Sequence, residues 1–179
     1  MATWEASMLA LFDDLEQQAA GLSLLERDLE VADRSQAEYA TVALAGRLHA
    51  SVGRELTVRL AGGRVTSGRL VRTGPDWLML DAAGSEWVLR TAAVVSVSGL
   101  STRSDSDETW SVVDRLGVRA VLRRLAAEAS ECVVHALDGQ QVEGRVGRVG
   151  EDFLELHVGR ESVHVVPTAS MAALQRRGA

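Results

Sequence analysis

The chain has 179 residues, 46% of them hydrophobic, enough to bury the core of one medium-sized domain or two very small ones. No apolar run approaches the roughly 18 to 20 residues that a membrane-spanning helix needs, so we expect no membrane segment. The first residues, MATWEASMLALFDDLEQQ, carry acids where a secretory signal carries positive charge. A single cysteine, Cys132, excludes a disulfide framework. Together these features favour a protein of the reducing cytoplasm.

The formal net charge of −6 is distributed unevenly along the chain. Residues 1–40 hold nine acids and two arginines, residues 41–100 hold seven arginines and four acids, and residues 101–179 hold ten arginines and twelve acids. This asymmetry indicates that different parts of the chain face different partners, or one another.

In the N-terminal region an amphipathic helical stripe is predicted, because apolar residues recur at intervals of three and four. They are Trp4, Met8, Leu11, Leu15, Leu22, Leu25 and Leu29. Gly21, followed by Ser23 and Glu26 at capping-box spacing, predicts a break and a second helix. The stripe either packs against its own domain or seals a dimer as a short coiled coil. A further helix is predicted over YATVALAGRLHASVG, residues 39–53.

Two segments, residues 55–80 and 131–156, repeat one another with a constant offset of 76, which indicates an internal duplication. Each begins with a half-buried strand, LTVRL or CVVHA, followed by a hairpin dipeptide, Gly62-Gly63 or Asp138-Gly139. The second strand of each carries a glycine, Gly68 or Gly144, which marks a bend or a close backbone approach. Third strands begin at Trp77 and Phe153, fourth strands cover WVLR and VHVV, and fifth elements cover VVSVSGL and MAALQ.

The predicted fold class is therefore α+β: N-terminal helices followed by two helix-plus-five-stranded small β-barrels related by internal duplication. The helices that precede the barrels are expected at 39–53 and over VRAVLRRLAAEAS, residues 118–130. Five parts are predicted: an acidic helical region at 1–50, a first barrel at 51–100, a polar linker at 101–109, a helical connector at 110–129 and a second barrel at 130–179.

A helix followed by five bent strands resembles the Sm-like fold, and the same spacing is found in SH3-like barrels. The first repeat matches part of the first Sm signature, with alternating Leu56, Val58 and Leu60, then Gly63, Gly68, Leu70 and Asp76. The resemblance implies a small barrel whose strand edges pair with those of other barrels. RNA-binding Sm proteins place an Asn before the third strand and an Arg-Gly pair after the fourth. Both repeats lack these residues, so uridine recognition is not implied.

Four arginines, Arg59, Arg64, Arg69 and Arg72, give the first repeat a positive bias. Alternation places Arg59 and Arg69 outward, where a basic groove would hold the phosphates of RNA or another single-stranded nucleic acid. The alternatives are an ordinary solvated surface, and a contact with the acidic N-terminal helices.

The stretch RLGVRAVLRRL, residues 115–125, resembles the turn and recognition helix of Fis-type helix-turn-helix regulators. That resemblance implies that Arg119, Arg123 and Arg124 approach DNA. The alternative is a helix that packs before the second barrel. A third possibility is a protein-protein adaptor that uses the N-terminal stripe, with homo-oligomers formed through those helices or through barrel edges.

Two histidines, His157 and His164, lie on a predicted hairpin around Gly159. If Val158 pairs with Glu161, then Glu155 lies opposite His164, but such a set without a cysteine or supporting partner is typical of a polar surface. No metal and no cofactor are therefore predicted. His49 and His135 have no neighbouring partner set in the sequence, and no nucleophile or acid-base pair is recognisable. We expect a non-enzymatic binding or regulatory protein.

Overall fold

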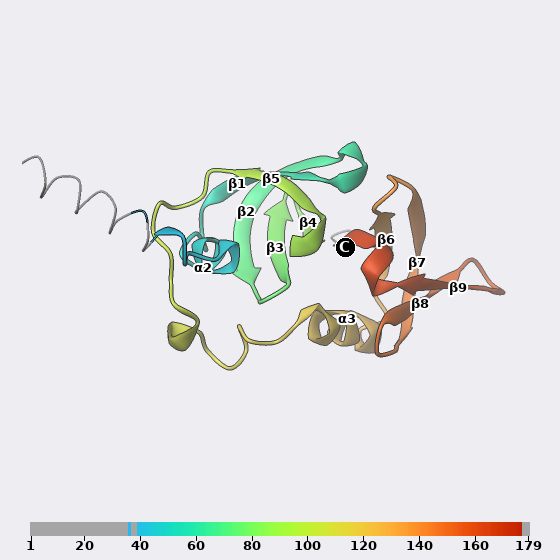
Figure 1. Ribbon diagram of the computed structural model, residues 1–179. Helices are drawn as coiled ribbons and strands as arrows, with labels where there is room; N and C mark the ends of the chain where they lie inside the picture. Colours follow the sequence, from blue (N-terminus) through green and yellow to red (C-terminus); the bar gives the residue numbers. More distant parts are fainter. Residues whose placement is uncertain (1–35, 37–38, 177–179) are drawn as a thin grey trace, which may run out of the picture. The chain divides into compact units, whose positions relative to one another are not determined.

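The computed structural model describes residue 36 and residues 39–176. The predicted N-terminal stripe, residues 4–29, lies outside the described residues. The chain divides after Val42 into two units, and the second contains every element discussed below. Its α-helices are α2 (Leu44–His49) and α3 (Val118–Ala127) (Figure 1). Its strands are β1 (Glu55–Leu60), β2 (Val65–Thr73), β3 (Trp77–Ala82), β4 (Ser85–Arg90), β5 (Val94–Ser98), β6 (Glu131–Ala136), β7 (Gln141–Val149), β8 (Phe153–Val158), β9 (Ser162–Pro167) and β10 (Met171–Arg176).

The ten strands lie where the alternation and turn signals predicted them. In β1 the apolar residues are buried and Glu55, Thr57 and Arg59 are exposed, which is the pattern of a half-buried strand. Gly62 adopts a φ of 78° in the turn between β1 and β2, a conformation that is costly for residues with a Cβ. The helix predicted over residues 39–53 is shorter than expected, because α2 covers only Leu44–His49 within it.

The two mid-strand glycines have the predicted role of permitting close backbone approach. Gly68 pairs with Leu56 in β1, and Gly144 pairs with Cys132 in β6. A Cβ added to Gly144 would stand 2.6 Å from the carbonyl oxygen of His157, and one added to Gly68 would collide with the carbonyl oxygen of Asp81. Each glycine therefore lets its strand cross tightly over the following strand.

The predicted fold class, N-terminal helices with two separate helix-plus-strand barrels, is wrong. The ten strands form one antiparallel sheet in the order β5-β1-β2-β3-β4-β10-β6-β7-β8-β9. The ladder passes from one repeat to the other where β4 pairs with β10, with Leu89 opposite Ala173 and Val88 opposite Leu174. The strands of each repeat are consecutive in this order, and the edges of the whole sheet are β5 and β9.

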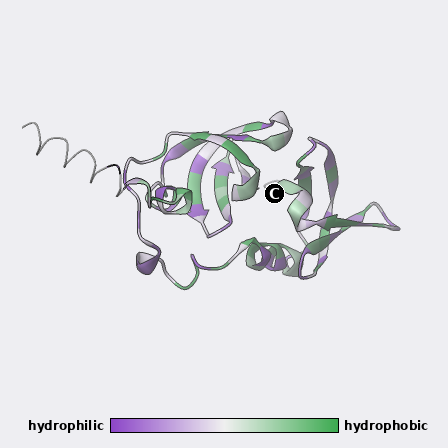
Figure 2. Cartoon of the chain, in the orientation of Figure 1, coloured by the Kyte–Doolittle hydropathy of each residue, from purple (hydrophilic) through white to green (hydrophobic). Residues whose placement is uncertain are grey.

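The continuous sheet has a physical cause in strands that are buried on both faces. In β4, Trp87 and Leu89 join one hydrophobic cluster while Val88 joins a second. In β10, Ala172 likewise belongs to the first cluster and Leu174 to the second. A strand that is apolar on both faces gains more by lying inside a sheet than at the wet edge of a separate barrel. Figure 2 shows hydrophobic and hydrophilic residues interspersed along the strands.

Helix α3 packs on the second repeat through one apolar face, and Figure 1 shows it beside β7 and β8. Val118, Leu122 and Leu125 are buried within the second cluster. The carboxylate of Asp76, in the turn before β3, accepts a hydrogen bond of 2.9 Å from the Val118 amide. Asp76 thus caps the helix from a distant part of the chain. Neither described helix is long and apolar enough to cross a membrane.

Candidate functional site

The structure does not bring the four predicted arginines of the first repeat together. Arg59 is exposed on β1 opposite Val65. Arg69 lies at the other end of the same face, about 13 Å further along the strands. There it is opposite Glu55, and its guanidinium is 3.9 Å from the carboxylate of Asp81.

Arg72 faces a different part of the unit. It lines a groove of about 410 Å³ beside α3, together with Arg124 and Arg176. The guanidinium of Arg176 is within 3.3 Å of Glu86 and 3.0 Å of Glu128, so part of the groove's positive charge is already paired.

Arg64 stands apart, because it belongs to a cluster with two aromatic rings. Its guanidinium carbon is 5.8 Å from the ring centroid of Trp87 in β4. Trp87 in turn stacks on His135 of β6, with ring centroids 4.9 Å apart and an interplanar angle of 19°. A cation over an indole face is attracted to it and held in place.

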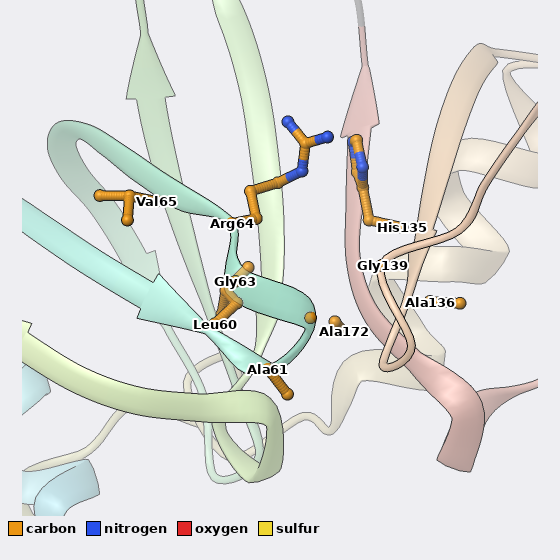
Figure 3. A pocket seen from close by; sticks show the side chains of 10 residues that line it. Leu60, Ala61, Gly63, Arg64, Val65, His135, Ala136, Gly139 and Ala172 are labelled. Carbon is orange, nitrogen blue, oxygen red and sulfur yellow. The ribbon is translucent and has the colours of Figure 1, made fainter.

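Arg64 and His135 border a pocket of about 300 Å³ between the β1–β2 turn, β6 and β10 (Figure 3). Figure 3 shows the Arg64 guanidinium extending toward the His135 ring. The lining residues are Leu60, Ala61, Gly62, Gly63, Arg64, Val65, His135, Ala136, Gly139 and Ala172. Arg64 carries the only charge among these lining side chains when His135 is neutral, and no acid is present. Small residues make up most of the wall, which leaves room for a ligand.

His135 is an unusual residue for a core, because only 3% of it is exposed and neither ring nitrogen makes a hydrogen bond of normal geometry. Burial, and then the positive charge of Arg64, lower the pKa of His135 to about 4, while the side chain of Gln175 opposes this shift. The ring is therefore neutral at neutral pH and offers one N–H donor and one acceptor nitrogen. A buried polar group without a partner is costly, which makes this ring a candidate for ligand binding.

This pocket was not predicted from the sequence. His135 lies in the strand CVVHA, and no residue near it in the sequence indicates which side chains it contacts. Its neighbours Trp87 and Arg64 come from the other repeat. The one available signal was an imidazole in an otherwise apolar strand, a position where a polar group needs a compensating partner.

The arginines predicted for DNA lie on α3, whose buried face points into the core. Arg119, Arg123 and Arg124 are all exposed, and Arg124 forms an ion pair of 3.0 Å with Glu128. A helix-turn-helix needs another helix ahead of this one. Between residues 101 and 117 the structure has only a three-residue 3₁₀ segment, Asp107–Thr109.

The predicted polar linker is fastened to α2. The Nδ1 atom of His49 is 2.7 Å from the carboxylate of Asp105, and the His49 ring stacks on Trp110 with centroids 5.2 Å apart. Asp114 approaches the other ring nitrogen of His49 at 3.7 Å. A hydrogen bond from the Ser111 hydroxyl helps to lower the pKa of Asp114. These contacts account for His49 as a structural residue.

The register assumed for the histidine hairpin is wrong by one residue. Val158 pairs with Ser162, so Glu155 is opposite Val165 and His164 is opposite Leu156. A shift of one residue moves a side chain to the other face of the sheet, which separates His164 from Glu155. The Glu155 carboxylate instead accepts a hydrogen bond of 3.1 Å from Arg148. Within the described part of the chain, no three potential ligands are placed to hold a metal ion.

Compared with models of known protein families, the chain matches none, and no curated protein matches it either.

Proposed function

We propose that the protein is a non-enzymatic binding protein of the cytoplasm whose ligand is RNA or another single-stranded nucleic acid. One observation carries the proposal: Arg64 lies over Trp87 at a pocket that contains a buried, unpartnered histidine. In the described part of the chain no carboxylate lies within ion-pair distance of Arg64. An arginine of this kind is well suited to a phosphate group, whose oxygens match its planar donors.

A second arginine extends this basic surface. Arg59 pairs across the strands with Val65, which itself lines the pocket, so Arg59 stands beside the pocket rim. Thr57 and Ser67 follow on the exposed face, with their hydroxyls 2.8 Å apart. Arg69, at the far end, is opposed by carboxylates. We therefore assign phosphate contacts to Arg59 and Arg64, and not to all four predicted arginines.

Two sequence features support the same ligand and compartment. The resemblance of the first repeat to Sm-like proteins agrees with RNA as the ligand, although a base would have to be held differently here. The thiol of Cys132 is buried, and burial raises its pKa to about 12, so it stays protonated and unreactive. A single inert thiol suits a reducing cytoplasm.

The test is binding of a random single-stranded RNA pool to the full chain between about 50 and 200 mM salt. We expect the double variant Arg59→Glu, Arg64→Glu to bind at least about tenfold more weakly. Its salt dependence, plotted as log K against log salt, should be shallower by about 1.4, because two phosphate contacts are lost.

The matched control is Arg119→Glu, Arg123→Glu, which makes the same charge change on α3. This variant should retain wild-type affinity for RNA. If only this control variant loses affinity, the nucleic acid binds at the α3 surface, which favours the DNA-binding alternative. If the wild-type chain does not bind RNA in a salt-dependent way, the proposed function is refuted.

Self-association is a second candidate, because the edge strands of the sheet are β5 and β9. By the offset of 76, β9 corresponds to β4 and β5 corresponds to β10, the two strands that pair within the chain. Val163 and Val165 of β9 are 49% and 60% exposed. We propose that β9 of one copy pairs with β5 of another in the same manner.

Sedimentation of the wild type and of Val165→Lys tests this second candidate. A lysine on an edge strand opposes pairing, so the variant should be smaller at concentrations where the wild type associates. Val112→Lys is the control, since Val112 is 82% exposed and lies outside the strands. A wild type that stays monomeric over the accessible concentration range would rule the interaction out.

A further inference from the structure

We infer that the pocket beside Arg64 and His135 binds a phosphate monoester, and that a nucleic acid enters it by a phosphorylated end. The second half of this inference rests on the proposed function, and the first half does not. Three features of the pocket lead to it: its charge, the chemistry of the histidine, and the closed side of the cavity.

The charge of the lining selects an anion. Arg64 is its only permanently charged side chain, and no carboxylate lines the cavity. The contact with Trp87 holds the guanidinium at the pocket while leaving its N–H donors available. Because the chain as a whole carries a net charge of −6, a pocket with a positive charge and no acid is distinctive. A group with two negative charges gains more from it than a group with one.

The histidine distinguishes a monoester from a diester. A neutral imidazole presents one donor and one acceptor, and neither nitrogen of His135 makes a hydrogen bond of normal geometry. A phosphate monoester has a second pKa of about 6, so near neutral pH it is present in two forms: the dianion can accept the ring N–H, and the monoanion can donate its proton to the ring's acceptor nitrogen. A diester has no proton of this kind and leaves the acceptor nitrogen of a neutral ring unsatisfied.

The shape of the pocket also favours a chain end. The β1–β2 turn meets the β6–β7 turn closely enough that a Cβ on Gly62 would lie 2.7 Å from the Gly139 nitrogen. This contact closes one side of the cavity. An internal phosphate must let the chain leave in two directions, whereas a terminal phosphate needs only one exit. At about 300 Å³ the cavity is at the small end for ligand pockets, enough for a phosphate and part of a nucleoside.

The first experiment compares short RNAs of one sequence that carry a 5′-phosphate, a 3′-phosphate or no terminal phosphate, using fluorescence anisotropy with the full chain. We expect one phosphorylated form to bind about tenfold more tightly than the unphosphorylated form, the size expected for charge-assisted hydrogen bonds. His135→Phe keeps a ring stacked on Trp87 but removes both nitrogens. This variant should bind all three RNAs with affinities that no longer depend on the terminal phosphate.

The control variant is His164→Phe, an exposed histidine on β9, which should keep the preference. Circular dichroism establishes that each variant is folded. If all three RNAs bind equally and depend on Arg59 and Arg64, the monoester inference is wrong while the proposed function stands.

The second experiment needs no nucleic acid. Adding inorganic phosphate or a nucleoside monophosphate should shift the ring nitrogen resonances of His135 in the NMR spectrum, and should not shift those of His164. If these shifts occur while no RNA binds, the phosphate site stands and the nucleic-acid function fails. If His135 does not respond to inorganic phosphate, to a nucleoside monophosphate or to a phosphorylated RNA, the inference is overturned.

Discussion

Acid should destabilise this fold through His135 in a way that one substitution removes. The pKa of His135 is lowered from its ordinary value of 6.5 to about 4, first by burial and then by Arg64. Between these two values the unfolded chain binds a proton that the folded chain does not. The free energy of unfolding therefore rises with pH across this window and is lost as the pH falls from 6.5 toward 4.

The size of the effect follows from the gap between the two pKa values. At about 1.4 kcal/mol per pKa unit, protonation of His135 in the unfolded state lowers the free energy of unfolding by about 3 kcal/mol at pH 4. About two thirds of this is lost by roughly pH 5. Since small domains are stable by about 5 to 15 kcal/mol, a change of this size is readily measured.

The assay is urea unfolding of the wild type and His135→Phe at several pH values between about 7.5 and 4.5. Other titrating groups act in both proteins, so the difference between the two isolates His135. We expect the wild type to lose about 2 to 3 kcal/mol more than the variant over this range. His164→Phe should run parallel to the wild type. If the curve for His135→Phe also runs parallel to the wild type, the ring is not buried and neutral as the structure has it.

Three further predictions concern the fold. Gly144→Ala should destabilise the protein by about 1 to 3 kcal/mol in urea unfolding, because its Cβ would press on the carbonyl of His157, and unchanged stability would refute the close contact. Asp76→Ala should cost about 1 kcal/mol through loss of the cap on Val118, and Asp76→Asn should recover most of that; equal losses would refute the capping role. Cys132 should react with a thiol reagent only at the rate of unfolding, and rapid labelling under native conditions would contradict its burial.

The sequence by itself determined the strands and their turns. Alternation in LTVRL, the glycines at positions 62 and 68, and the starts at Trp77 and Phe153 are local signals, because each depends on side-chain direction or backbone freedom within a few residues. They placed all ten strands. They could not show which edges meet, since pairing between β4 and β10 joins residues that are far apart in sequence.

Tertiary structure alone decided the site. Of the arginines that the sequence singled out in the first repeat, only Arg64 faces an aromatic ring and a buried histidine; Arg69 is opposed by acids, and Arg72 lines a different groove. The distinction arises because β10 lies between β4 and β6, which brings Trp87 of one repeat against His135 of the other. Periodicity predicts the face on which a side chain lies, but the partner it meets there depends on how the strands are ordered in the sheet.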